Sequence, residues 1–229
     1  MRTTAIIPVK RFGHAKQRLL DELDRPQRAA VVKAMLDDVL RALDASDEVE
    51  RVIVVTGEGR AERIALRHSR RSPTPLEVLR EPADRGHSEA AVLGIIRALS
   101  LGADCTALLP GDCPLLDAAE LDAALERMHR GRVAVIPDRH GTGTNGLLLA
   151  PADAIGPAFG PGSAERHRDR ASRAGYDVAT EELASLALDL DTPEDLEALA
   201  ARLAEEPASA SATAGALESI GRLPTPRPG

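Results

Sequence analysis

The sequence predicts an α/β fold with a mostly parallel central sheet covered by helices. Short β-branched, apolar runs alternate along the chain with stretches of helical spacing, which is typical of parallel strands joined by crossover helices. Apolar residues make up 43% of the 229 residues, which is enough to form a full core, although only 1% are aromatic. A length of 229 residues fits one large domain better than two small ones.

The expected elements follow one another in order. The first strand is apolar and β-branched, and Pro26 suits the first turn of the helix that follows it. The expected strands are residues 3–9, 51–56, 76–79, 105–109, 133–136, 146–149 and 186–190. The expected helices are residues 26–43, 60–69, 89–101, 117–130, 163–174 and 193–203, with Asp117, Ser163 and Thr192 as N-caps.

The chain is expected to contain one domain, residues 1–206. Residues 207–229 are rich in Ala, Ser, Pro and Gly and have no core pattern, which predicts a disordered tail.

The net charge and the cysteine content indicate which partners the protein can bind and which cellular compartment suits it. The net charge of −7 is spread along the chain, which argues against nucleic-acid binding by a basic surface. No apolar run is long enough to span a membrane, and the N-terminus does not resemble a signal peptide. Cys105 and Cys113 are too few for a disulfide framework. We therefore expect a cytoplasmic protein that binds neither nucleic acid nor membranes.

Polar loops follow the first, third and fourth expected strands. Ligands of parallel α/β sheets bind beyond the carboxyl ends of the strands, so these loops should converge on one cleft.

The loop after the first strand is basic. It carries Lys10, Arg11, Lys16 and Arg18 around Gly13, and two of the chain's three lysines lie in it. Such a loop can hold a polyphosphate, although it lacks the Walker pattern. The alternative is a solvated basic loop. Its position directly after a buried strand favours ligand binding.

Two further segments offer carboxylates. Asp112 stands in a Gly/Pro-shaped turn after the fourth expected strand, where it could hold Mg²⁺ or merely cap a turn. Asp189 and Asp191 alternate with leucines, which predicts that both point to one face of a strand end. Two carboxylates on one face repel each other unless a cation lies between them, so these residues suggest metal ligation together with Asp112. The alternative is that Asp191 helps Thr192 to cap the last helix.

Two small-residue loops suit an anionic second substrate. Residues 138–145 are rich in hydroxyls, and residues 159–163 form a Gly turn that feeds a helix N-terminus, where backbone N–H groups could face an anion. Each alone could be an ordinary turn or cap. His167, in the helix that follows, could face the cleft or be solvated.

These segments together resemble a known family. The chain is similar to the 2-phospho-L-lactate or phosphoenolpyruvate guanylyltransferases of coenzyme F-420 biosynthesis, within the wider NTP-transferase group. The resemblance covers residues 3–203. Its specific parts are IPVKRFGHAKQRL, AMLDDVL, LLPGDCPLL, DRHGTGTNGLLL, FGPGSAERH and LDLDTPEDL.

The resemblance implies a single-domain, Rossmann-like nucleotidyltransferase fold of the GT-A-like type. It also implies Mg²⁺-dependent transfer of GMP from GTP to a small phosphorylated three-carbon acid, with release of pyrophosphate. A downstream enzyme of F-420 biosynthesis could accept the product. The implied metal ligands are Asp112, Asp189 and Asp191, the implied triphosphate ligands are Lys10, Lys16 and Arg18, and the implied acceptor ligands are Thr144, Gly160 and Ser163. Of these, Lys16 and Asp112 are the predicted catalytic residues.

One stretch departs from the family pattern. Members usually have Gly-Leu-Asn-Ala after the third strand, where this chain has Gly86-His87-Ser88-Glu89. Ser88 therefore stands where an Asn could contact the nucleotide, and it is the predicted nucleotide ligand of this loop.

Several alternatives stay open from the sequence. The acceptor could be phosphoenolpyruvate, 2-phospholactate or 3-phosphoglycerate, because a single contact can discriminate among them. Phosphoenolpyruvate is favoured only by the Arg- and Ala-rich composition, which hints at a bacterium with a GC-rich genome. The rival functions are a sugar-phosphate or molybdopterin nucleotidyltransferase and a non-catalytic nucleotide-binding regulatory protein.

Overall fold

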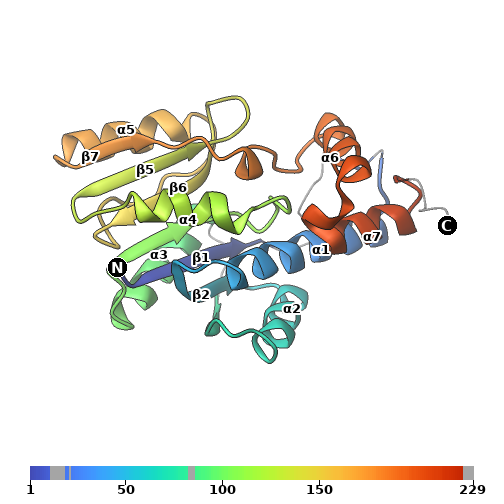
Figure 1. Ribbon diagram of the computed structural model, residues 1–229, viewed down its shortest axis with the longest axis horizontal. Helices are drawn as coiled ribbons and strands as arrows, with labels where there is room; N and C mark the ends of the chain where they lie inside the picture. Colours follow the sequence, from blue (N-terminus) through green and yellow to red (C-terminus); the bar gives the residue numbers. More distant parts are fainter. Residues whose placement is uncertain (11–18, 21, 82–85, 224–229) are drawn as a thin grey trace.

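A seven-stranded sheet forms the centre of the molecule (Figure 1). The computed structural model describes residues 1–10, 19–20, 22–81 and 86–223. Within these residues the strands lie in the order β3-β2-β1-β4-β6-β5-β7. The strands are β1 (Thr3–Val9), β2 (Val49–Thr56), β3 (Leu76–Arg80), β4 (Cys105–Leu108), β5 (Arg132–Pro137), β6 (Thr144–Ala150) and β7 (Asp177–Thr180).

One strand of the sheet runs against the others. β6 pairs antiparallel with both β4 and β5, whereas all other neighbouring pairs are parallel. The first residues of β6 therefore lie at the edge where the parallel strands end. The predicted single-domain α/β class with a mostly parallel sheet is confirmed.

Helices cover both faces of the sheet, and the core is divided accordingly. Alternate strand residues face opposite sides, so Ala5 and Ile7 belong to one apolar cluster and Ile6 to the other. The first face is covered by α1 (Arg25–Asp44), α2 (Gly59–Ser69), α4 (Ala118–Glu126), α6 (Pro193–Glu205) and α7 (Ser211–Ser219), and the second by α3 (His87–Ser100) and α5 (Ser163–Arg173). No helix of the described residues is long and apolar enough to cross a membrane.

Two of the three predicted N-caps are confirmed. Asp117 accepts the backbone N–H of Glu120, and Thr192 accepts that of Asp195 in a capping box. The prediction for Ser163 was wrong. Gly162, with φ of +70°, occupies the N-cap position of α5, and Ser163 is the first helical residue.

The last expected strand, residues 186–190, was also wrong. A 3-10 turn, η2 (Ala184–Leu186), and an irregular extended segment take its place. Leu186 and Leu190 are buried, which explains the strand-like pattern, but their segment joins no ladder of the sheet. The edge strand is instead β7, whose residues are exposed or half-buried and so lack an apolar signal.

The described part of the predicted disordered tail is ordered. Residues 207–223 form the 3-10 turn η3 (Pro207–Ala210), α7 and a short turn, and α7 packs on α1. Asp38 of α1 accepts the backbone N–H groups of Ala212 and Thr213 at 3.0 and 2.7 Å, while Leu217 is fully buried. A small apolar face and one buried carboxylate therefore hold a segment whose composition alone suggested disorder.

Candidate functional site

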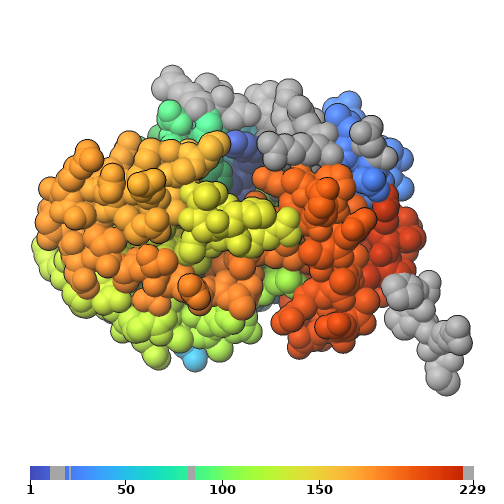
Figure 2. All heavy atoms as spheres, turned by 90° about the horizontal axis from the view of Figure 1, so that it is seen from above, coloured from blue at the N-terminus to red at the C-terminus, as the bar shows by residue number. Residues whose placement is uncertain are grey.

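The predicted site residues gather at the carboxyl edge of the sheet. Lys10 follows β1 directly, Asp112 lies in the turn after β4, and Thr144 begins β6 at the same edge. Seen from above, the loop after β5 lies between the α5 side of the molecule and α6 (Figure 2). Lys16 and Arg18 lie outside the described residues.

The Gly86–Glu89 stretch is the start of α3 rather than a loop. Gly86 is the N-cap with φ of +111°, a backbone conformation that favours glycine, and His87 and Ser88 form the first turn. Further along α3, a Cβ on Gly94 would lie 2.3 Å from the Ile6 side chain, so this glycine lets the helix lie close on β1.

His87, which the sequence did not single out, is close enough to Asp112 and Lys10 of the predicted site for their charges to affect it. Burial lowers its pKa to about 4, while the nearby Asp112 raises that pKa and Lys10 lowers it. The start of α3, the end of β1 and the turn after β4 therefore lie close enough for their charged groups to interact. At neutral pH the His87 ring is uncharged.

Ser88 links the start of α3 to the predicted acceptor loop. Its hydroxyl accepts the backbone N–H of Phe159 at 3.0 Å, and the His87 ring packs edge-on against the Phe159 ring with 4.8 Å between the centroids. Two segments about 70 residues apart are therefore joined by a hydrogen bond and a ring contact. A hydroxyl that accepts this bond keeps its own hydrogen for another partner.

A hydroxyl cluster lies where β6 begins and α5 begins. The Ser163 hydroxyl donates to Thr144 Oγ1 at 3.0 Å, and His167 Nδ1 lies 3.0 Å from the same oxygen. Thr144 is partly exposed, whereas Ser163 and His167 are buried. Of the three, Thr144 is therefore the side chain that can meet a ligand.

The backbone donors at the start of α5 are used within the protein. The Ser163 N–H donates to the Gly160 carbonyl and the Ala164 N–H to the Thr142 carbonyl. The prediction that these groups face an anion is therefore wrong for both. Gly160 has φ of +114°, and a Cβ there would meet nothing within 4 Å, so its backbone conformation rather than crowding calls for glycine.

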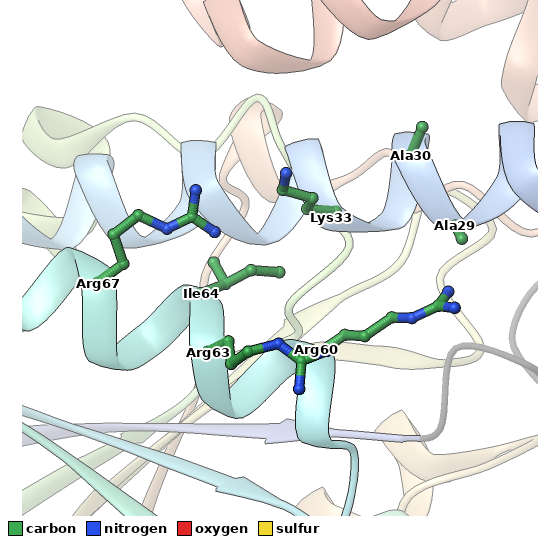
Figure 3. A pocket seen from close by; sticks show the side chains of 7 residues that line it. All are labelled: Ala29, Ala30, Lys33, Arg60, Arg63, Ile64 and Arg67. Carbon is green, nitrogen blue, oxygen red and sulfur yellow. The ribbon is translucent and has the colours of Figure 1, made fainter.

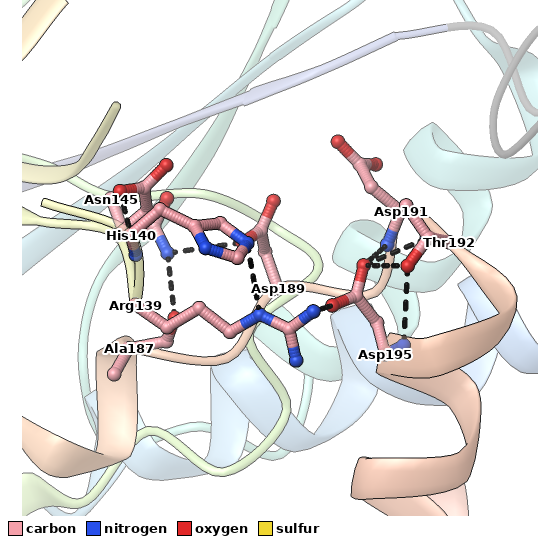
Figure 4. Close-up of polar contacts among 9 residues, drawn as sticks. Arg139, His140, Asn145, Ala187, Asp189, Asp191, Thr192 and Asp195 are labelled. Atoms are coloured by element: carbon pink, nitrogen blue, oxygen red, sulfur yellow. Dashed lines mark hydrogen bonds and ion pairs between the residues drawn. The ribbon is translucent and has the colours of Figure 1, made fainter. Parts of the chain in front are cut away.

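The segment that carries Asp189 and Asp191 is held by the loop after β5 and by Asn145. Asn145 Nδ2 donates to the Leu186 carbonyl at 2.8 Å and to Asp189 Oδ1 at 3.3 Å. The Arg139 N–H donates to the Ala187 carbonyl at 3.0 Å. Figure 4 shows both carboxylates pointing to the same side of the segment.

The start of α6 anchors the same segment from the other end. Asp195 Oδ2 accepts the backbone N–H groups of Asp191 and Thr192 at 2.9 and 2.7 Å, and Asp195 Oδ1 pairs with Arg139 Nη2 at 2.6 Å (Figure 4). The capping carboxylate is therefore Asp195. The sequence analysis did not identify Arg139, Asn145 or Asp195, although the T-P-E-D capping pattern points to the last.

The donor chemistry of Asp112, Asp189 and Asp191 fits Mg²⁺. All three supply carboxylate oxygens, which Mg²⁺ prefers, and Mg²⁺ in such sites takes one or two carboxylates and completes its shell with water and substrate phosphates. Among the described residues, no group of three or more His, Cys, Asp or Glu side chains is arranged so that it could hold a metal ion by itself.

A basic groove lies between α1 and α2 (Figure 3). It encloses about 320 Å³ over a floor of alanines and Ile64, and its cations are Lys33, Arg60, Arg63 and Arg67. None of the predicted site residues lines it.

Comparison with known proteins gives one family for nearly the whole chain. Residues 3–204 match the family model described as guanylyl transferase, CofC like. The chain is 43% identical to the phosphoenolpyruvate guanylyltransferase of Conexibacter woesei over 222 residues, which cover 96% of this chain and 97% of that protein.

Relatives named for other acids are also similar. The chain is 40% identical to the 3-phospho-D-glycerate guanylyltransferase of Phenylobacterium zucineum, over 83% of this chain and 86% of that protein. It is 34% identical to the 2-phospho-L-lactate guanylyltransferase of Methanothermobacter thermautotrophicus, over 86% and 83%.

Solved structures support the fold. A nucleotidyl transferase from Methanothermobacter superposes with a TM-score of 0.63 at 17% identity, covering 89% of this chain and 98% of that one. At this identity the likeness concerns the fold alone.

Proposed function

This chain belongs to the CofC-like guanylyl transferase family, and we propose that it transfers GMP from GTP to phosphoenolpyruvate, releasing pyrophosphate, as a step of coenzyme F-420 biosynthesis. Phosphoenolpyruvate is the acceptor named for the relative with 43% identity, and relatives named for 3-phosphoglycerate and 2-phospholactate define the alternatives. Family membership favours guanylyl transfer over sugar-phosphate or molybdopterin chemistry and over a non-catalytic role.

The observation that carries the proposal is the pairing of two different groups at one sheet edge. Asp112 follows β4, and the Thr144–Ser163 hydroxyl pair, 3.0 Å apart, stands at the start of the neighbouring strand β6. Carboxylates suit a metal-bound triphosphate, and a hydroxyl suits a phosphate or carboxylate of a small acid. The metal-bound triphosphate and the small acid would then lie next to each other at this edge of the sheet.

The proposed reaction is an in-line displacement. A phosphate oxygen of the acceptor forms a bond to the α-phosphorus of GTP, the bond from that phosphorus to the bridging oxygen breaks, and pyrophosphate leaves with the electron pair. The acceptor phosphate is ionised near neutral pH, so no general base is needed. The protein's contribution is alignment and charge neutralisation.

Asp112, Asp189 and Asp191 are the residues that would hold Mg²⁺. The bound ion would supply positive charge opposite the triphosphate. Lys10 would add a cation from the end of β1, and we assign Lys16 and Arg18 to the same triphosphate on sequence grounds. Cys105 and Cys113 are buried and form no disulfide, and we propose that the protein acts in the reducing cytoplasm.

A parallel product assay tests the proposal. Purified protein is incubated with GTP, Mg²⁺ and one of phosphoenolpyruvate, 2-phospholactate or 3-phosphoglycerate, and pyrophosphate and the guanosine product are measured. We expect the highest kcat/KM with phosphoenolpyruvate and none without an acid. ATP and CTP in place of GTP test the base preference at the altered Gly86–Glu89 stretch. Pyrophosphate release with sugar phosphates but with none of the three acids would refute the assignment.

A further inference from the structure

His167 is the only histidine on α5, and both of its ring nitrogens are engaged. Its side chain is fully buried. Nε2 lies 2.8 Å from the backbone nitrogen of Ala158, and Nδ1 lies 3.0 Å from Thr144 Oγ1. A buried ring with two partners on two different segments is oriented, not solvated.

The first of these contacts decides which nitrogen carries the hydrogen. A backbone N–H can only donate, so His167 Nε2 must accept and therefore bears no hydrogen. In the neutral ring the hydrogen then stands on Nδ1, which donates to Thr144 Oγ1. Burial, followed by the charges of Arg170 and Arg166, lowers the pKa of His167 to about 4, which keeps the ring in this neutral form at physiological pH.

The second contact decides where the Thr144 hydrogen goes. Thr144 Oγ1 accepts from His167 Nδ1 and from the Ser163 hydroxyl, and a hydroxyl oxygen has two lone pairs. Both are then occupied, so the Thr144 hydroxyl is left to act as a donor. Within the part of the chain that the structure describes, no protein acceptor for that hydrogen is found.

We propose that His167 is a positioning residue that, with Ser163, turns the Thr144 hydroxyl into a fixed donor aimed at an anionic oxygen of the acid substrate. This inference rests on the proposed function, because it assigns the donor to the acceptor acid. Thr144 makes the contact, and His167 and Ser163 act through it. Phe159 holds the other side of the His167 ring, with its centroid 5.3 Å away.

The competing explanation is that His167 only fixes the turn at Ala158. Two substitutions separate the explanations. In His167→Asn the shorter amide can present an N–H near the place of Nδ1, whereas in His167→Gln the longer amide can present a carbonyl oxygen near the place of Nε2. The first variant keeps the donor to Thr144, and the second keeps the acceptor for Ala158.

Steady-state kinetics with GTP and phosphoenolpyruvate provide the measurement. We expect His167→Gln to raise the KM for the acid about tenfold, the effect of losing one hydrogen bond to a charged group, with the KM for GTP unchanged. His167→Asn should stay within about threefold of the unsubstituted protein. In a Thr144→Val background, His167→Gln should cause no further rise. The reverse order of the two variants, or no change in either, would overturn the proposal.

The tautomer can be tested without substitution or turnover. Nuclear magnetic resonance of protein with ¹⁵N-labelled histidine should show one ring with hydrogen on Nδ1 and none on Nε2, unchanged from pH 8 to pH 5.5. His167→Gln assigns that signal by its loss. A hydrogen on Nε2 of His167 would overturn the proposal whatever the kinetics of the two variants. Failure of the proposed function is distinct, since it appears as absent activity in the unsubstituted protein.

Discussion

The hydroxyl of Ser88, in the first turn of α3, accepts a hydrogen bond from the backbone N–H of Phe159, with 3.0 Å between the two atoms. Ser88 is the residue predicted to bind the nucleotide, and Phe159 precedes the acceptor residue Gly160. This hydrogen bond joins the two segments predicted to bind the substrates. Ser88, which departs from the family pattern, therefore has a structural role. It also makes the residue testable against both substrates.

Ser88→Ala should raise the KM for the acid about fivefold, because the loss of one neutral hydrogen bond frees the turn at Phe159. The KM for GTP should stay within about twofold. Steady-state kinetics with each substrate varied in turn provides the measurement, with Ser100→Ala at the other end of α3 as the matched control. A rise confined to the KM for GTP would instead make nucleotide binding the main role of Ser88.

Asp112→Asn should lower kcat on the order of 100-fold or more, because one charge opposite the triphosphate is lost. Pyrophosphate release at increasing Mg²⁺ measures the effect, and thermal unfolding checks that the fold is kept. Asp117→Asn, five residues on, is the control, since Asn caps a helix as well as Asp does. Normal turnover of Asp112→Asn would remove the carboxylate from the metal site.

The stability of the protein should fall as the pH is lowered from about 6.5 towards 4. The folded state holds the pKa of His167 at about 4, below its ordinary value of 6.5, so in this window the unfolded chain binds the proton and the folded chain does not. The loss from this one residue reaches about 2.5 kcal/mol at pH 4.5 and vanishes above pH 7. Urea unfolding at pH 7.5 and 4.5 measures it. His167→Gln should show a smaller difference between the two pH values, and an equal difference would contradict the assignment.

Asp38→Ala should destabilise the fold by about 2–4 kcal/mol, because the backbone N–H groups of Ala212 and Thr213 would lose their acceptor. The free energy of unfolding in urea gives the magnitude. Asp37→Ala is the matched control: its carboxylate makes an ion pair with Arg41 on the surface, which contributes at most about 1 kcal/mol. Equal effects of the two substitutions would show that α7 does not depend on Asp38.

The sequence predicted those features whose cause is local. Pro26, Asp117 and Thr192 mark helix starts because capping involves residues three or four apart, and the apolar runs of β1, β2 and β4 are buried on both faces. The loops that follow the first and fourth expected strands, with Lys10 and Asp112, were placed at one edge because parallel strands end together.

What the sequence did not predict depends on distant partners. β7 is an edge strand with little apolar content, and its pairing with β5 is a property of the whole sheet. The order of residues 207–223 depends on Asp38, more than 170 positions earlier. The roles of His87 and His167 follow from rings and backbone groups that meet only after folding.

The docking of α7 on α1 has a consequence for how this protein is made. The backbone groups that donate to Asp38 are translated 174 and 175 positions after it, so α1 leaves the ribosome well before its partner segment exists. Until residues 211–219 have been made and docked, the part of α1 that α7 covers lacks this cover.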